Sequence, residues 1–511
     1  MESATLTRPR PGILALARLR LARLRAVPWP TVALVALAGL TAVGFFAYPT
    51  FPNYDSYYSL LWGREVLHGI SPSFDGYRTP TEHPLAIAFG AVLSLVGDDA
   101  DRIMVGATLG SFVVLAAGMY RLGKAAFTPL VGLIAAALLV TRFDFPFLAA
   151  RGYIDIPFLA LVIWAAVLEA ERPRRGTPVA VLLALASLLR PEAWLLSGLY
   201  FLWLAPARGW RARVGLAALA AAGPVLWCLT DLIVTGKPLF SLQHTSALAE
   251  ELGRASGLRA VPKSSYYFLL GLDKAPVFYA GFAGLLAAVL ATPRRAVMPL
   301  VLFGVGLGTF VLVGIAGLSI IERYLLIPSL MVMIFAAVAL GGWTMLVQGS
   351  RLRRAWALGA AAIVLYGLVF TATRVNFGQF DNELRFRGSA HRSLEAVLGD
   401  RAVRRGLRCG PLSVPSHKLV PDARWVLGLG ADDVLARSGV TEKNPDGRTL
   451  TERAKRTRVV IRRGVALYAT DRSSLLRQAL VEPSDDPANS LPLPGFQRRV
   501  TSRYYGAYVG C

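Results

Sequence analysis

The sequence predicts a mainly α-helical protein, with a polytopic bundle of about eleven transmembrane helices followed by a small extracytoplasmic α+β domain. Three observations support this prediction: hydrophobic residues make up 54% of the 511-residue chain, they gather in long blocks, and arginines collect between those blocks. A helix needs roughly 20 apolar residues to cross a bilayer, and backbone groups in lipid must bond within their own segment. Each block therefore predicts one helix.

The first block, 28–48, follows the basic segment 1–27, which contains six arginines. The block is longer than the apolar part of a signal peptide. We therefore expect it to be the first span, with segment 1–27 in the cytoplasm. The other predicted spans are 103–120, 128–141, 153–170, 178–190, 192–206, 213–234, 276–292, 296–316, 322–345 and 355–373.

The run 84–97 is apolar but short for a span, so it predicts an interfacial or re-entrant helix. With this interpretation, all five basic loops that follow lie on the cytoplasmic side, as the positive-inside rule requires. The membrane domain is then 28–373, its first outer loop is 49–83, and 374–511 lies outside. Short β-type runs predict that this outer domain is α+β, and they occur at 413–414, 459–461 and 504–509.

The formal net charge of +23 does not predict nucleic-acid binding. The arginines act as topology signals, and no basic motif interleaved with aromatic residues accompanies them. Cys228 lies in an apolar block, whereas Cys409 and Cys511 both lie in the predicted outer domain. Because an extracytoplasmic location permits disulfides, we expect those two cysteines to be paired. The cysteines and histidines do not have the spacing of a zinc site.

Three ionisable residues of the first outer loop are candidates for chemistry. Asp55 follows the first span among aromatic residues, where a carboxylate suits a general base or a metal ligand. The alternative is that Asp55 caps a helix over 56–67. Glu82 and His83 lie where the chain returns to the membrane and suit a substrate hydroxyl or phosphate. The alternative is a simple cap before a helix that begins with proline.

Five more ionisable residues lie at predicted outer ends of spans, where charges are costly and often functional. Arg151 and Asp155 begin the fourth span, and they predict either a substrate-binding pair or an interfacial salt bridge. Arg190 and Glu192 lie at a tight turn, where they either pair with each other or bind a lipid-linked phosphate. Arg323 is placed either to meet an anionic headgroup or to snorkel to the interface.

Taken in order, these short motifs resemble the GT-C glycosyltransferases, most of all the protein O-mannosyltransferase and lipid A aminoarabinose transferase branch. The likeness covers roughly residues 28–340 and depends on motif order and topology more than on any one motif. The motifs are Asp55, Glu82-His83-Pro84-Leu85, Arg151-x-x-x-Asp155, Arg190-Pro191-Glu192 and Arg323-Tyr324-Leu325.

The resemblance implies an enzyme that moves a sugar from a polyprenyl-phosphate donor to an acceptor on the outer face of the cytoplasmic membrane. Asp55 would be the catalytic base, and Arg190 and Arg323 would stabilise the departing phosphate. Glu82 and His83 would hold the phosphate or the acceptor. Arg151, Asp155 and Glu192 complete the predicted substrate-binding set.

The sugar stays open, and the acceptor is a protein, a glycan or a lipid. We expect no cofactor and no metal, although a divalent metal remains an alternative because one branch of these enzymes uses it. A transporter or flippase of a lipid-linked substrate would share the membrane setting, but such folds often contain internal repeats, and none is evident here. A non-catalytic membrane scaffold is the third alternative.

Overall fold

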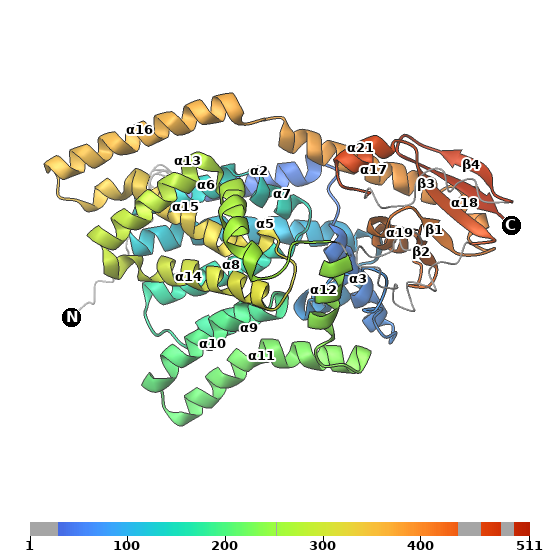
Figure 1. Cartoon of the computed structure of the whole chain (residues 1–511), viewed down its shortest axis with the longest axis horizontal. Coiled ribbons are helices and arrows are strands. Elements are labelled where there is room, and N and C mark those ends of the chain that lie inside the picture. The colour runs from blue at the N-terminus through green and yellow to red at the C-terminus, as the bar shows by residue number, and fades with distance from the viewer. Residues whose placement is uncertain (1–28, 252, 438–460, 482–494) are drawn as a thin grey trace, which may run out of the picture.

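The computed structural model describes residues 29–251, 253–437, 461–481 and 495–511. A bundle of long helices forms most of the molecule, and a smaller unit that contains all the described strands lies at one end of it (Figure 1). Each part has its own hydrophobic core. The expected mainly α fold with a small α+β domain is confirmed. The predicted cytoplasmic segment 1–27 lies outside the described residues.

The bundle and its connections contain the α-helices from α2 to α16. Their bounds are α2 Trp29–Ala47, α3 Tyr54–Leu67, α4 Pro84–Ser94, α5 Ala100–Ala126, α6 Pro129–Thr141, α7 Asp144–Ala150, α8 Asp155–Glu171, α9 Thr177–Leu189, α10 Glu192–Leu204, α11 Trp210–Thr235, α12 Phe240–Glu251, α13 Val261–Ala291, α14 Pro293–Ile315, α15 Leu326–Gly341 and α16 Arg351–Arg374.

Each segment predicted to span the membrane coincides with one of these helices. In the described part of the chain, seven helices are long and apolar enough to cross a bilayer, or eight if the bent pair of α6 and α7 is one span. A multi-pass membrane protein is therefore confirmed, whereas the total of about eleven crossings stays a prediction. The predicted span 276–292 is the second half of α13, which kinks at Lys274, two residues before Pro276.

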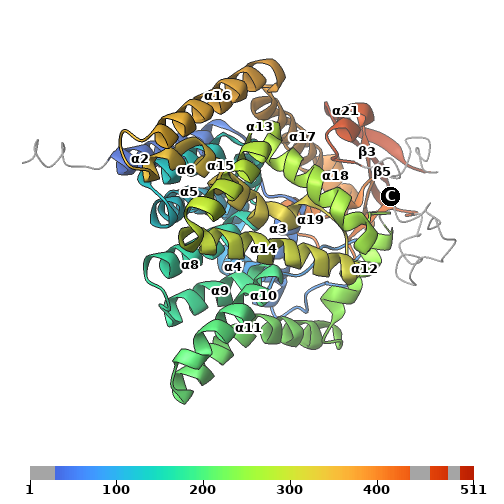
Figure 2. The same ribbon diagram turned by 60° about the vertical axis from the view of Figure 1, so that its left-hand side comes forward.

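Helix α15 lies at the centre of the bundle, and every one of its residues except Leu340 is buried. By contrast, α2 has no buried residue and α16 has only Ala360. Helix α16 runs along the outer edge of the bundle in both views (Figures 1 and 2). Apolar side chains on such peripheral helices suit contact with lipid, since only backbone groups need internal partners there.

Helices α3 and α4 form a tightly packed pair. Helix α4 has 11 residues, or about 17 Å at 1.5 Å per residue, which is too short to cross a bilayer of about 30 Å. A Cβ atom added at Gly63 would lie 2.3 Å from the backbone nitrogen of Ala91, and one added at Gly90 would lie 2.4 Å from the carbonyl oxygen of Ser59. The two glycines therefore let the backbones touch, which fixes the position of α3.

The C-terminal unit contains one five-stranded sheet of order β2-β1-β3-β5-β4. Strand β1 is parallel to β2 and β3, whereas β5 is antiparallel to β3 and β4. The bounds of its elements are α17 Gln379–Leu398, α18 Arg401–Gly406, β1 Leu412–Val414, α19 Val420–Leu427, β2 Val434–Ala436, β3 Gly464–Ala469, α21 Arg472–Arg477, β4 Gln497–Thr501 and β5 Tyr505–Gly510.

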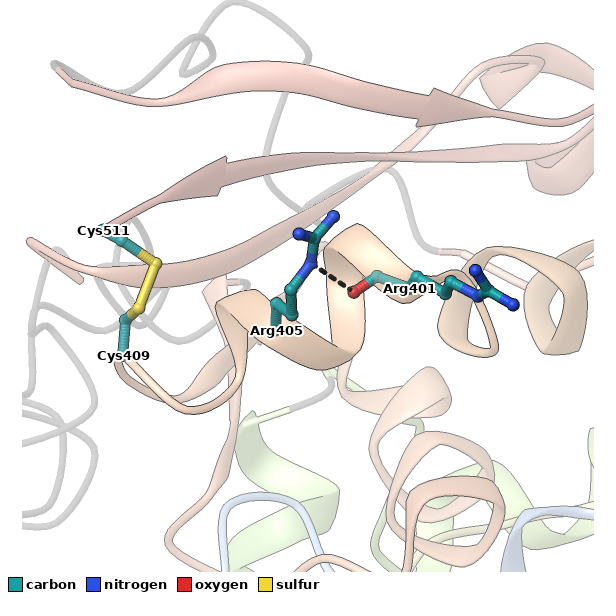
Figure 3. The surroundings of a disulfide bond; sticks show 4 residues. All are labelled: Arg401, Arg405, Cys409 and Cys511. Atoms are coloured by element: carbon teal, nitrogen blue, oxygen red, sulfur yellow. Dashed lines mark hydrogen bonds between the residues drawn. A yellow bond between two sulfur atoms is a disulfide. The ribbon is translucent and has the colours of Figure 1, made fainter.

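Of the three β-type runs expected from the sequence, 413–414 falls in β1 and 504–509 largely in β5. In the third run, 459 and 460 lie outside the described residues, and Ile461 is not in a strand. A disulfide joins Cys409, which follows α18, to Cys511 at the end of β5, with 5.5 Å between their Cα atoms (Figure 3).

Candidate active site

Asp55 occupies the first turn of α3. The helix is capped by Asn53, whose side-chain oxygen accepts hydrogen bonds from the backbone N–H groups of Asp55, at 2.7 Å, and of Ser56, at 3.2 Å. The alternative interpretation, that Asp55 itself caps this helix, is therefore wrong. Because Asn53 satisfies those backbone donors, the Asp55 carboxylate is left to face a cavity.

The Asp55 carboxylate belongs to a row of five alternating charges. Arg323 Nη1 lies 3.0 Å from Asp55 Oδ2 and 3.5 Å from Asp155 Oδ2. Arg190 contacts the other oxygen of Asp155, and its Nη2 lies 2.6 Å from Glu192 Oε1. Three carboxylates and two guanidinium groups from four separate segments of the chain therefore meet. Arg190 and Glu192 pair with each other, as one interpretation held, and Arg323 contacts Asp55 and Asp155.

Arg151 does not pair with Asp155, so the interfacial salt bridge between them is wrong. Its guanidinium instead lies 3.8 Å from the centre of the Phe51 ring, and its Nη1 donates to the Phe51 carbonyl at 2.9 Å. Its own carbonyl accepts from the backbone N–H of Asn53 at 2.7 Å. Arg151 therefore holds the chain that leads to Asp55, although it also lines the cavity.

A glycine turn next to Arg151 adds a second support for this segment. Gly152 has a φ of +67°, which favours a residue without a Cβ atom. Its carbonyl accepts a hydrogen bond of 2.6 Å from the Ser56 hydroxyl. The turn before α8 is thus bonded to the Asn53 backbone N–H and to the Ser56 hydroxyl in the first turn of α3, so the positions of Asp155 and Asp55 are linked.

His391 of the C-terminal unit stacks on the Phe51 ring, with ring centres 3.9 Å apart and an angle of 10° between the planes. Its Nδ1 lies 3.2 Å from Asp422, and its Nε2 lies 3.3 Å from Glu395. Although burial lowers the pKa of His391, the two neighbouring carboxylates outweigh burial and raise the pKa from 6.5 to about 9. His391 is therefore a cation at neutral pH, and it holds Phe51 against Arg151.

Glu82 and His83 are adjacent in the chain but lie in different environments. Glu82 is fully buried, and neither carboxylate oxygen has a hydrogen-bond partner among the described residues. Burial raises its pKa to about 8, so Glu82 is mostly protonated at neutral pH. It is not among the residues that line the cavity, whereas His83 is. The His83 ring packs edge-on against Trp227, at 5.7 Å between ring centres.

These residues surround a cavity of about 880 Å³ between the bundle and the C-terminal unit. Of the eight site residues expected from the sequence, six line it, whereas Glu82 and Asp155 do not. The sequence did not point to its C-terminal wall, which consists of Arg387, Ala390, His391, Leu394, His417, Lys418, Leu419, Asp422, Ala479, Leu480 and Tyr505. Nor did it point to Trp227 and Asp231 of α11. Most of these residues lie in helices or turns of ordinary composition, so no local signal marks them.

Among the described residues, no group of three or more His, Cys, Asp or Glu side chains could hold a metal ion. The acids of the charge row are instead paired with arginines. An arginine–carboxylate row can orient a general base and offer N–H donors to phosphate oxygens. This arrangement suits acid–base chemistry beside an anionic group.

The fold is similar to those of several solved structures. The crystal structure of ArnT from Cupriavidus metallidurans bound to undecaprenyl phosphate superposes with a TM-score of 0.53 at 12% identity, covering 94% of this chain and 98% of that one. The fold is of the GT-C type. No protein-family model matches the sequence, and neither does any curated protein.

Two structures of the Archaeoglobus fulgidus oligosaccharyltransferase are also similar. The one tethered to an acceptor peptide with the NVT sequon has a TM-score of 0.49 at 11% identity, covering 95% of this chain and 74% of that one. The apo form has a TM-score of 0.48 at 12% identity, covering 89% and 72%. At such identities the likeness concerns the fold, and the site must be argued from this chain's own residues.

Proposed function

We propose that this protein is a membrane glycosyltransferase that transfers a sugar from a polyprenyl-phosphate donor to an acceptor at the outer face of the cytoplasmic membrane. One observation supports this proposal above all others. In a fold of the GT-C type, Asp55 and two arginines line one cavity between membrane helices and a polar domain. ArnT, which shares the fold, was crystallised with undecaprenyl phosphate.

In the proposed reaction, Asp55 accepts the proton of an acceptor hydroxyl while that oxygen attacks the anomeric carbon of the sugar. A new carbon–oxygen bond to the acceptor forms as the bond to the phosphate breaks, and polyprenyl phosphate leaves. A single displacement inverts the anomeric configuration. Arg323, 3.0 Å from Asp55, orients the base and lies next to the developing negative charge.

Arg190 is the second group proposed to stabilise the leaving phosphate, because a guanidinium offers several N–H donors in a fixed plane. Asp155 contacts both Arg190 and Arg323, so its proposed role is to position them. His83, whose ring lines the cavity, is proposed to contact the phosphate or the acceptor. Glu82 is buried away from the cavity and is proposed to shape the loop rather than touch substrate.

The proposal places the N-terminus in the cytoplasm and the C-terminal unit outside, with a protein, glycan or lipid as acceptor. It includes no cofactor and no divalent metal, so transfer in the presence of EDTA should equal transfer without it. The C-terminal cysteine pair agrees with an oxidising compartment.

The decisive experiment uses membranes that contain the protein and a panel of radiolabelled polyprenyl-phosphate sugars. Wild type is compared with Asp55→Asn and with Asp98→Asn, a control acid that is exposed and does not line the cavity. Release of one sugar by wild type and Asp98→Asn, with at least a 100-fold loss in Asp55→Asn at equal expression, is the expected result.

Equal turnover by wild type and Asp55→Asn would remove Asp55 as the base. Energy-independent movement of the intact donor across the membrane of vesicles that contain the protein, with no cleavage of the sugar–phosphate bond, would instead support the transporter alternative.

A further inference from the structure

The same cavity contains a second group of basic residues, away from the charge row. Arg78 comes from the first outer loop, Arg254 from the link between α12 and α13, and His417 and Lys418 from the C-terminal unit. All four line the cavity. We call this group the cationic corner. Its members come from three distant segments, so the fold itself assembles it.

Two members of the cationic corner are almost fully buried yet reach the cavity. Arg78 is 4% exposed and His417 is 5% exposed, and Arg78 Nη1 lies 3.5 Å from His417 Nδ1. Arg78 also has a φ of +54°, a left-handed conformation that costs a non-glycine residue of order 1 kcal/mol. The surrounding structure therefore holds a buried cation in place at an energetic cost.

The charges around His417 decide its protonation state. Burial and the neighbouring cations Arg78, Lys418 and Arg254 lower the pKa of His417 well below 6.5, so the ring is neutral at pH 7. Because Arg78 approaches Nδ1, that nitrogen acts as the acceptor, and the ring proton resides on Nε2. His417 then adds a neutral N–H donor to a group of three cations, a combination that suits an oxyanion.

The cationic corner adjoins the proposed base. The Tyr54 hydroxyl donates to the Arg78 carbonyl at 2.8 Å, and the Tyr54 ring packs edge-on against His417 at 5.8 Å between ring centres. Tyr54 is followed directly by Asp55. A molecule with a hydroxyl at Asp55 could therefore place a second group among these cations. Arg190 and Arg323 belong to the charge row instead, where they contact Asp55, Asp155 and Glu192.

We propose that the cationic corner binds an oxyanion, a phosphate monoester or a carboxylate, carried by the substrate that presents its hydroxyl to Asp55. This inference rests on the proposed function for the identity of that substrate. The oxyanion subsite is separate from the place of the leaving phosphate. Arg78, Arg254 and Lys418 supply the charge, and His417 supplies a directional donor.

The test measures binding by isothermal titration calorimetry on the purified full-length protein in detergent micelles. The probes are inorganic phosphate, glucuronate and the neutral methyl glucoside, each titrated with saturating farnesyl phosphate present to occupy the leaving-phosphate site. Wild type should bind phosphate or glucuronate but not methyl glucoside. The variant Arg254→Gln/Lys418→Gln, which spares the buried Arg78 and His417, should bind the anions at least 10-fold more weakly.

A matched control removes two positive charges from the C-terminal unit at positions that do not line the cavity. Arg401 and Arg405 lie on α18 near the disulfide and are exposed (Figure 3). The variant Arg401→Gln/Arg405→Gln should bind the anions as wild type does. Equal weakening in both double variants, or complete loss of anion binding when farnesyl phosphate is present, would overturn the proposal.

Two further outcomes refine the result. Stronger binding of phosphate would assign a phosphate monoester to the substrate, and stronger binding of glucuronate would assign a sugar acid. Farnesyl phosphate binding is measured separately in wild type and in Arg190→Gln. Because neither measurement needs turnover, failure of the oxyanion subsite can be told apart from failure of the proposed glycosyltransferase function.

Discussion

Replacing Arg190 by glutamine should strongly destabilise the protein through the acids that it neutralises. The Arg190 side chain is 7% exposed, and its partners Asp155 and Glu192 are 0% and 7% exposed. The charge row carries three negative and two positive charges, so Arg190→Gln leaves three carboxylates and one arginine. Breaking a buried ion pair from one side costs about 3–5 kcal/mol. We expect about 3 kcal/mol, because the adjoining cavity can admit water.

A second substitution separates charge balance from packing. In Arg190→Gln/Glu192→Gln, one carboxylate is removed together with the arginine, and the row returns to its original net charge. The double variant should therefore regain about 1–2 kcal/mol relative to Arg190→Gln alone. Its sugar transfer should stay as low as that of the single variant, because Arg190 is proposed to contact the phosphate.

The free energy of unfolding is measured by titrating dodecyl maltoside micelles with sodium dodecyl sulfate, following helix content by circular dichroism. The control is Glu171→Gln, which breaks the ion pair between Glu171 and Arg121. The Glu171 side chain is 29% exposed and the Arg121 side chain is 47% exposed. An exposed pair should lose less than about 1 kcal/mol. A loss in Arg190→Gln no larger than the control's, or a double variant less stable than the single one, would refute the reasoning.

Three further predictions concern the supports of the site. Replacing Cys409 and Cys511, separated by 102 residues, with serine should cost the C-terminal unit about 4 kcal/mol, seen as faster proteolysis. The pKa of His391 rises from 6.5 in the unfolded chain to about 9 in the folded protein. The protonated ring therefore contributes fully to the free energy of unfolding below pH 6.5, and this contribution is lost as the pH rises through about 9. Between pH 6 and pH 10 the free energy of unfolding of wild type should thus fall by about 3 kcal/mol more than that of His391→Gln. Gly63→Ala, with a Cβ atom 2.3 Å from a backbone nitrogen, should cost about 3 kcal/mol, whereas Gly110→Ala, with no atom within 4 Å, should cost nothing measurable.

The helices of the bundle could be predicted because lipid imposes length and composition on each crossing independently of the others. A block of roughly 20 apolar residues specifies a helix wherever it packs, and every such block is a helix in the structure. The re-entrant interpretation of 84–97 followed from counting basic loops, and α4 has the short length that it requires. Topology also sorted the ionisable residues onto one side, and six of the eight expected site residues line one cavity.

Pairing within the site could not be predicted from spacing. Arg151 and Asp155 are four residues apart, as in a helical ion pair, but the left-handed conformation of Gly152 prevents a continuous helix between them. Arg151 therefore contacts Phe51, and Asp155 forms ion pairs with Arg190 and Arg323. The partner of each charged side chain depends on which other segments of the chain lie near it in the folded protein. A short stretch of sequence does not contain that information.

The C-terminal unit was the least predictable part, since its strands are short and partly polar. Strand β2 has three residues, and β4 reads Gln-Arg-Arg-Val-Thr with mostly exposed side chains. Neither shows the alternation of apolar and polar residues by which strands are recognised. His391 shows the consequence for the site. It is one histidine in the amphipathic helix α17, and only the fold brings it onto Phe51.

The position of Asp55 depends on two parts of the chain that meet at Phe51. From the bundle, Arg151 packs at 3.8 Å from the Phe51 ring and binds its carbonyl. From the C-terminal unit, His391 stacks on the same ring at 3.9 Å. An aromatic ring attracts a cation at its face, so both contacts are favourable and together they fix the segment that ends at Asp55. Since the same C-terminal unit contributes His417 and Lys418 to the cavity, the packing that positions the proposed base also completes the proposed oxyanion subsite.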